Sequence, residues 1–199
     1  MVSDELERWF SAHGDKTIAG LLEFFGHKSF ALLFVILMAP TALPLPTGGV
    51  TYVFEATAIL LAAQLVLGRE HVWLPQRWRR IRFGDDKDRF ARNLIKLIRW
   101  LERFSRPRMR FLFGRRASNI AFGLLVMVGS LAAMLAPPFA GLDTLPSLGV
   151  VLLSLGVLLE DAYVAIAGLI LGAAGIAVEI LLGAAAIRGI EELTSAKRP

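Results

Sequence analysis

Apolar residues gather in two blocks, 30–67 and 118–187, that contain no lysine or arginine. The first block is interrupted by "APTALPLPTGGV" (39–50), which carries three prolines and two adjacent glycines. A proline inside a helix removes a backbone hydrogen bond and clashes with the preceding turn. The pattern therefore predicts two helical arms, over 30–43 and 49–67, joined by a break. The first arm is about 21 Å long if helical, which is less than the roughly 30 Å of a hydrocarbon core.

The second block is divided in a similar way. It predicts three helices, over 118–136, 147–159 and 162–187, of which the second is short and the other two are long enough to span a membrane. Ahead of both blocks, apolar residues at helical spacing predict amphipathic helices over 4–12 and 16–25 that lie on the membrane or pack against the bundle. We therefore expect an all-α integral membrane protein.

These patterns divide the chain into five segments. They are an amphipathic N-terminal segment (1–29), a first membrane repeat (30–68), a basic amphipathic segment (69–117), a second membrane repeat with the last transmembrane helix (118–187), and a polar tail (188–199). Composition agrees with this division, because 55% of the residues are hydrophobic and the mean hydropathy is +0.58, well above a soluble domain. The chain has no cysteine, which excludes a disulfide framework and thiolate chemistry.

Positive charge is concentrated between the two blocks. Sixteen of the 22 lysines and arginines lie between Arg69 and Arg116, with five acidic residues, so this stretch has a net charge of +11. In "DRFARNLIKLIRWLERF" (88–104) the apolar residues follow helical spacing and the basic residues occupy the other faces, which is typical of a helix lying on anionic lipid. The positive-inside rule places residues 69–116 in the cytoplasm. We expect no nucleic-acid partner, because membrane segments flank this stretch at both ends.

The break in the first block has a counterpart in the second. "APTALPLPTGGV" (39–50) resembles "APPFAGLDTLPSLGV" (136–150) in its Ala-Pro start, its Leu-Pro centre and its Gly-Val end. Two such breaks in corresponding places indicate a repeat of broken membrane helices around a central site, which we expect to be an inverted repeat. Non-helical backbone at membrane depth must be buried in protein or line a wet cavity. The breaks are therefore expected to be re-entrant and to meet near the midplane; the alternative is a pair of plain extracytoplasmic turns between short helices.

Polar groups at and near the breaks are the candidate binding groups. Freed backbone groups, hydroxyls and half-helix N-termini there could coordinate an anionic head group. Glu55 and Glu179 lie inside apolar arms, where an ionisable residue is functional by default, although each could instead be a neutral, hydrogen-bonded side chain. The candidate substrate-binding residues are Pro40, Pro44, Pro46, Thr47, Gly49, Glu55, Gln64, Arg69, Pro137, Pro138, Pro146, Ser147, Glu160 and Glu179.

Several of these candidates have a structural alternative. Gln64 is as readily explained by hydrogen bonding between helices as by the site. Glu160 and the adjacent Asp161 either relay protons or form a solvated cap, and could pair with Arg69 across the repeat. The small residues of "GAAGIA" (172–177) predict a helix contact in a homodimer.

Catalysis is not indicated by the sequence. The three histidines are scattered, no glycine-rich phosphate loop follows a strand, and no nucleophile lies in a recognisable spacing from a base. We therefore expect no enzyme activity, no metal and no cofactor.

Five stretches together resemble the ExoD family of bacterial inner-membrane proteins of exopolysaccharide synthesis, over roughly residues 17–187. They are "LLEFFGHKSF", the proline cluster 40–46, "AAQLVLGREHVWLP", "APPF…LPSLGV" and "LGVLLEDA". The likeness lies in their order and spacing. It implies the signature positions Glu23, Gly26, Pro40, Pro44, Pro46, Gln64, Gly68, Pro75, Pro138, Pro146, Gly156, Glu160 and Asp161. The chain departs from the family pattern at His27, where a basic residue is usual, and in a longer linker after Phe139 that leaves the role of Asp143 open.

The resemblance implies a location in the bacterial inner membrane and a part in exopolysaccharide production, without an established reaction. The broken hairpins are also similar in architecture, more weakly, to DedA-type proteins, which move polyprenyl phosphate or phospholipids between leaflets. We therefore expect a transporter or flippase for an anionic membrane lipid or lipid-linked saccharide carrier, with Glu55 or Glu179 coupling protons. The alternative is a non-transporting scaffold that binds polysaccharide-synthesis proteins through its basic segment. A membrane enzyme acting on lipid carriers is a third, less supported reading.

Overall fold

The computed structural model describes residues 4, 7–8, 18–43, 49–69, 71–73, 95–96, 99, 116–136 and 141–195. The elements in these ranges are helical, with no β-strand among them, and this confirms the all-α prediction for the described part of the chain. They are α2 (Ile18–Phe25), a 3-10 turn (Gly26–Lys28), α3 (Ser29–Met38), α4 (Val50–Val66), α7 (Arg116–Leu135), α8 (Thr144–Leu159) and α9 (Ala162–Ser195). The centres of both breaks and most of the basic segment lie outside the described residues.

The short helix α3 forms the centre of the bundle. A helix that is hydrophobic on every side has to be buried, and α3 is buried on nearly every side, including Phe30, Phe34, Val35 and Met38. It packs against α4 and α8. The ring of Phe34 meets the ring of Phe122 from α7 edge to face, with centroids 5.6 Å apart, which is an arrangement that aromatic pairs prefer.

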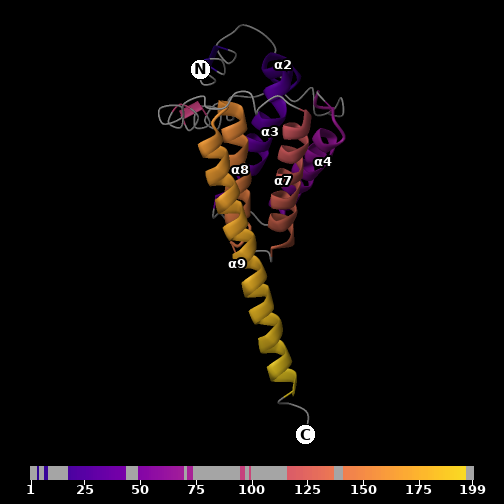
Figure 1. Ribbon diagram of the computed structural model, residues 1–199. Helices are drawn as coiled ribbons and strands as arrows, with labels where there is room; N and C mark the ends of the chain where they lie inside the picture. Colours follow the sequence, from indigo (N-terminus) through magenta and orange to yellow (C-terminus); the bar gives the residue numbers. More distant parts are fainter. Residues whose placement is uncertain are drawn as a thin grey trace.

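Helices α4 and α7 lie side by side and run in opposite directions (Figure 1). Gly123, near the start of α7, lies against Ala62 and Val66 at the end of α4, and the Arg116 side chain lies against Gly68. The start of α4 and the end of α7 therefore lie together at one end of the bundle, which we call the break end. The N-terminal residues and the described part of the basic segment lie at the other end (Figure 1).

The directions of the two hairpins bear on the expected inverted repeat. An inverted repeat places its two breaks at opposite ends of the bundle. Here the hairpin α3–α4 and the hairpin α7–α8 both turn at the break end, because α4 is antiparallel to α7 (Figure 1). The four helices run in the same sense in both hairpins, and they do not confirm the expected inverted repeat, which stays a prediction.

The closest backbone approach is between α8 and α9. An added Cβ on Gly149 would lie only 2.4 Å from the Cα of Gly172, and an added Cβ on Gly156 would lie 2.3 Å from the backbone nitrogen of Ala165. Small residues permit such close packing of helices. Further along, Gly175 lies against Pro146 at the start of α8. Glycines of the segment expected to form a dimer contact therefore pack within the chain, and the homodimer stays a prediction.

Helix α9 continues well beyond the break end (Figure 1). Two described helices are long and apolar enough to cross a membrane, α7 over its whole length and α9 over Ala162–Ala185, and only 11% of the α9 span is buried inside the molecule. The outer surface carries large exposed apolar side chains on several helices, such as Leu60, Leu135 and Ile180. Soluble monomers rarely expose contiguous apolar surface on this scale. Length, composition and surface together indicate a membrane protein.

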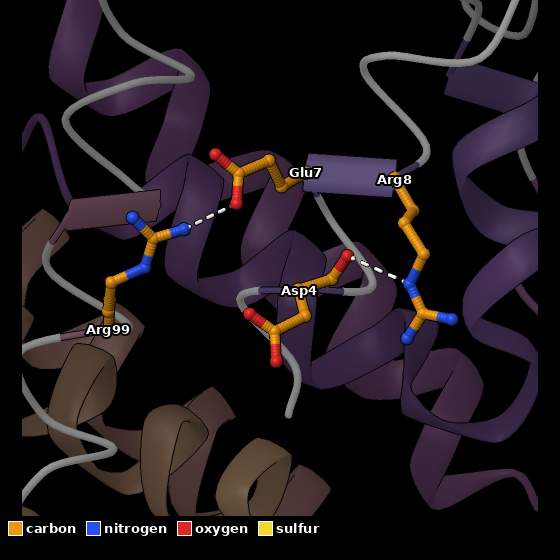
Figure 2. A network of polar contacts seen from close by, with 4 residues as sticks. All are labelled: Asp4, Glu7, Arg8 and Arg99. Atoms are coloured by element: carbon orange, nitrogen blue, oxygen red, sulfur yellow. Dashed lines mark hydrogen bonds and ion pairs between the residues drawn. The ribbon is translucent and has the colours of Figure 1, made fainter.

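The end opposite the breaks carries polar contacts between the N-terminal and basic segments. Figure 2 shows the Arg99 guanidinium paired with the Glu7 carboxylate at 2.5 Å, while Arg8 Nε donates to the backbone carbonyl of Asp4 at 3.2 Å. Ile95 is buried against the core, whereas the neighbouring Lys96 is exposed. The rest of the expected interfacial helix lies outside the described residues.

Candidate functional site

Three acidic residues from three elements come together at the break end. Glu55 lies on α4 six residues after Gly49, Asp143 directly precedes α8, and Glu179 lies on α9. Asp143 and Glu179 both exert a repulsive electrostatic effect on Glu55, and Asp143 exerts one on Glu179. We call these three residues the acidic cluster.

Glu55 is the buried member of the acidic cluster, whereas Asp143 and Glu179 are half-buried, and three carboxylate oxygens of the cluster lack the hydrogen bonds that burial normally requires. Glu55 is only 1% exposed, and neither of its carboxylate oxygens has a hydrogen-bond partner. Oε1 of Glu179 and the hydroxyls of Thr144 and Ser147 at the start of α8 are also buried without a partner. An unsatisfied buried polar group costs about 1–3 kcal/mol, and more if it is charged. Several such groups in one place need a functional explanation.

Glu55 is buried because of its position on α4. The inward face of this helix carries Thr51, Glu55, Ala58, Ala62 and Leu65 at intervals of three or four residues. This spacing puts them in one stripe that faces the other helices. The sequence therefore directs a carboxylate, rather than another apolar side chain, into the packed interior.

No basic side chain of the bundle helices balances these carboxylates in the described structure. Helices α3, α4 and α8 contain no lysine or arginine, and Arg116 of α7 lies at the opposite end of the bundle. On α9, Arg188 follows Glu179 by nine residues, about 13 Å along the helix. The acidic cluster therefore favours protons or cations. An anionic head group, the ligand expected at the breaks, would be repelled there unless the carboxylates were neutralised.

The structure brings together some of the predicted site residues at the break end. Pro146 and Ser147 lie in the first turn of α8 beside the acidic cluster, which itself contains the predicted Glu55 and Glu179. The turns on either side of the first break also carry predicted residues. Pro40 is half-buried directly after α3, and Gly49 is exposed directly before α4. Pro44, Pro46, Thr47, Pro137 and Pro138 lie outside the described residues.

Gln64 and Arg69 lie far from the acidic cluster, at the opposite end of the bundle. The Gln64 side chain makes two hydrogen bonds with the backbone of Trp73: its Nε2 donates to the carbonyl oxygen at 3.1 Å, and its Oε1 accepts from the N–H at 2.9 Å. Gln64 thus holds the chain that follows α4. Arg69 is exposed just after α4.

Glu160 also lies at the opposite end, one helix length from Asp143. Its carboxylate forms an ion pair with Lys28 at 2.8 Å. The next residue, Asp161, accepts a hydrogen bond from the Tyr163 N–H at 2.9 Å and so caps α9. These contacts favour the capping interpretation of Glu160 and Asp161 over membership of the break-end site.

Comparison with known proteins gives the family. The family model described as "Exopolysaccharide synthesis, ExoD" matches residues 2–181. The chain belongs to the ExoD family. It is 32% identical over 154 residues to Protein ExoD of Rhizobium meliloti, a match that covers 76% of this chain and 64% of that protein. It is 30% identical over 176 residues to an uncharacterised protein of Synechocystis, covering 85% of this chain and 81% of the relative. No solved structure matches the chain.

The family is one of exopolysaccharide synthesis, as the resemblance implied. Sequence reasoning on this ExoD-family chain nevertheless missed two members of the break-end site, Asp143 and Thr144. A signal was available, because Asp143 is the only charged residue between Ser118 and Leu159. It directly precedes the Leu-Pro pair that begins α8, where an acidic residue complements the helix dipole.

Proposed function

We propose that this ExoD-family protein is a membrane transporter of exopolysaccharide synthesis, with its site between the two proline breaks. The acidic cluster supports this proposal most directly. Ionisable residues inside a membrane bundle are costly and mark ion or substrate pathways. A scaffold that binds proteins through its basic segment has no need for unpaired carboxylates in its interior.

The depth of the break end supports a re-entrant arrangement. Gly175, which lies against Pro146, is 13 residues from Ala162 and 12 residues from Ile187. These intervals correspond to about 20 Å and 18 Å of helix. If residues 162–187 cross the membrane, the start of α8 therefore lies near the middle of the hydrocarbon rather than outside it. Backbone that leaves a helix at such a depth must line a protein-enclosed site.

Helix packing supports a repeat whose two hairpins run in the same sense. α3 contacts α8 and α4 contacts α7, and within each hairpin the two helices also touch. A two-fold axis along the bundle that exchanges the hairpins would map each of these contacts onto another. Repeats related by an axis along the membrane normal occur in transporters beside inverted ones. In the proposed arrangement both breaks border one site.

The proposed cargo is an anionic membrane lipid or lipid-linked saccharide carrier. The net charge of +11 between Arg69 and Arg116 supports this choice, because basic segments attract anionic lipid at the cytoplasmic face of the inner membrane. An anion that reaches the acidic cluster requires at least part of its negative charge to be neutralised. Transport of an anion through this site is therefore proposed to depend on protons or cations.

A reconstitution experiment tests the transporter. Purified protein in vesicles is supplied with labelled polyprenyl phosphate in one leaflet, and its appearance in the other leaflet is measured with and without a pH gradient. We expect movement with the wild type and with Glu7→Gln, which changes an exposed carboxylate at the opposite end. Glu55→Gln is expected to lose most of the movement.

The scaffold predicts a different result. If the protein is a scaffold, labelled lipid stays in the leaflet to which it was added, and Glu55→Gln cells still produce exopolysaccharide. Under the scaffold, charge reversal at Arg77, Arg79, Arg80 and Arg82 abolishes production. Absence of lipid movement in wild-type vesicles, together with that cellular pattern, would refute the transporter.

A further inference from the structure

We propose that the acidic cluster is a proton-binding site, in which Glu55 or Glu179 carries a proton beside Asp143. The use of this proton to drive transport rests on the proposed function. The site itself rests on the burial and the missing partners of its groups. It goes beyond the proposed transport by naming the ion that the break end takes up.

The two glutamates come from different helices at the break end. Glu55 projects from the inward stripe of α4, and Glu179 lies on α9 one helical turn beyond Gly175. Asp143, directly before α8, exerts a repulsive electrostatic effect on both glutamates. Neighbouring carboxylates at a poorly solvated site cannot all be ionised at a low cost, and a proton on one of them removes part of that repulsion.

The unsatisfied oxygens fit a bound proton. Both oxygens of Glu55 and Oε1 of Glu179 lack hydrogen-bond partners. An ionised carboxylate without a partner is far more costly to bury than a neutral one, so the missing partners favour the protonated form.

A multivalent metal ion fits the site less well than a proton. Calcium takes six to eight oxygen ligands, and magnesium requires a near-ideal octahedral shell. Within the described ranges, no group of three or more acidic, histidine or cysteine side chains is arranged to hold a metal ion. The three carboxyl groups interact through their charges at longer range instead.

The other elements around the cluster bring no titratable group to it in the described structure. α3 has none, and Lys28 just before it is at the opposite end, paired with Glu160. α7 has only Arg116, also at the opposite end. α8 contributes Asp143 alone at the break end, and α9 adds Arg188 beyond Glu179. On α4 itself, Tyr52 lies three residues before Glu55. The acidic side chains at the break end of the described structure are the three carboxylic acids.

Labelling with a hydrophobic carbodiimide tests this site without any transport. The reagent reacts with protonated carboxyl groups in apolar surroundings, and peptide mass spectrometry identifies the modified residue. In purified protein over a pH series, we expect label on Glu55 or Glu179 and none on exposed Glu7. The labelling is expected to fall about tenfold for each unit of pH once the proton dissociates.

Two further measurements decide whether the site binds a proton. A potentiometric titration compares the wild type with Glu55→Gln and Glu179→Gln, each checked for unchanged thermal unfolding. It counts protons still bound in the neutral pH range, where ordinary glutamates are already ionised, and one fewer is expected in at least one of the variants. Equal proton counts in wild type and variants would overturn the proposal. Protection of the labelled glutamate by sodium or potassium at constant pH would also overturn it, in favour of a metal-cation site. A positive titration with no lipid movement would retain the proton site and reject the transporter.

Discussion

The contact between α8 and α9 allows a prediction in which two nearly identical substitutions have opposite effects. The Cα atoms of Gly149 and Gly172 face each other across this contact. An alanine Cβ at Gly149 would lie 2.4 Å from the Cα of Gly172 and 2.6 Å from its nitrogen, whereas an alanine Cβ at Gly172 would lie 3.6 Å from the Cα of Gly149. The first distance is impossible without movement of a backbone, and the second is an ordinary contact.

The size of the effect follows from the movement that Gly149→Ala requires. The shortest ordinary van der Waals contact for an added Cβ is 3.4 Å, so the helices must separate by about 1 Å locally. A gap of 0.5–1 Å forfeits roughly a quarter to a half of each contact energy, and overpacking of this kind costs about 1–3 kcal/mol. Both substitutions gain the same helix propensity, about 1 kcal/mol over glycine. Their difference in unfolding free energy therefore isolates the packing cost, at about 1–3 kcal/mol.

Denaturation in detergent measures this difference. Purified wild type, Gly149→Ala and Gly172→Ala are unfolded by increasing mole fractions of sodium dodecyl sulfate and followed by circular dichroism. Gly183→Ala is a matched control, because an added Cβ there meets nothing within 4 Å. Gly172→Ala and Gly183→Ala are expected to be as stable as wild type or more so, and Gly149→Ala to be less stable. Equal stability of the two facing alanine variants would refute the register of α8 on α9.

Three further predictions concern single side chains. Glu55→Leu is expected to raise the unfolding free energy in the same assay by about 1–3 kcal/mol, since it removes a buried carboxylate without a hydrogen-bond partner, and to abolish transport; a loss of stability would contradict this. Gln64→Ala is expected to speed hydrogen exchange of the Trp73 amide, which donates to the Gln64 side chain, and unchanged exchange by mass spectrometry would exclude that role. Lys28→Met is expected to cost about 1 kcal/mol or less, with the cost shrinking at high salt, because its ion pair with Glu160 is partly exposed; a salt-independent cost would show the reasoning to be wrong.

Helix positions were largely predictable, since apolar runs and helix-breaking residues are both visible in the sequence. Two helix boundaries in the structure differ from the predicted ones, each for a local reason. α8 begins at Thr144 rather than at residue 147, because Pro146 lies in the first turn, where its missing N–H costs no helical bond. α9 continues to Ser195 rather than ending at residue 187, because the residues that follow include good helix formers such as Arg188 and Glu191.

The two glutamates of the site were also predictable, because a lone charge in an apolar run is expensive wherever it lies. The sequence did not predict which residues lie at the same end of the bundle. Gln64 lies near the end of α4 and Glu160 directly after α8, at corresponding places in the repeat, yet both lie at the end of the bundle opposite Glu55. An alignment of repeats gives order along the chain, whereas the direction of each hairpin depends on the path taken between them. That path runs through the basic segment, whose hydrophobic pattern does not reveal whether the chain returns to the same side.

The enclosed position of α3 has a consequence for how the protein is assembled. A helix of ten residues is about 15 Å long, too short to rest across a bilayer by itself. One of the helices that cover it, α8, begins more than one hundred residues later in the chain. During synthesis the first hairpin therefore remains incomplete until the second has been made. The earliest apolar segment to leave the ribosome is thus among the last to reach its final packing, and a chain that stops before Thr144 exposes the surface of α3 that α8 would cover.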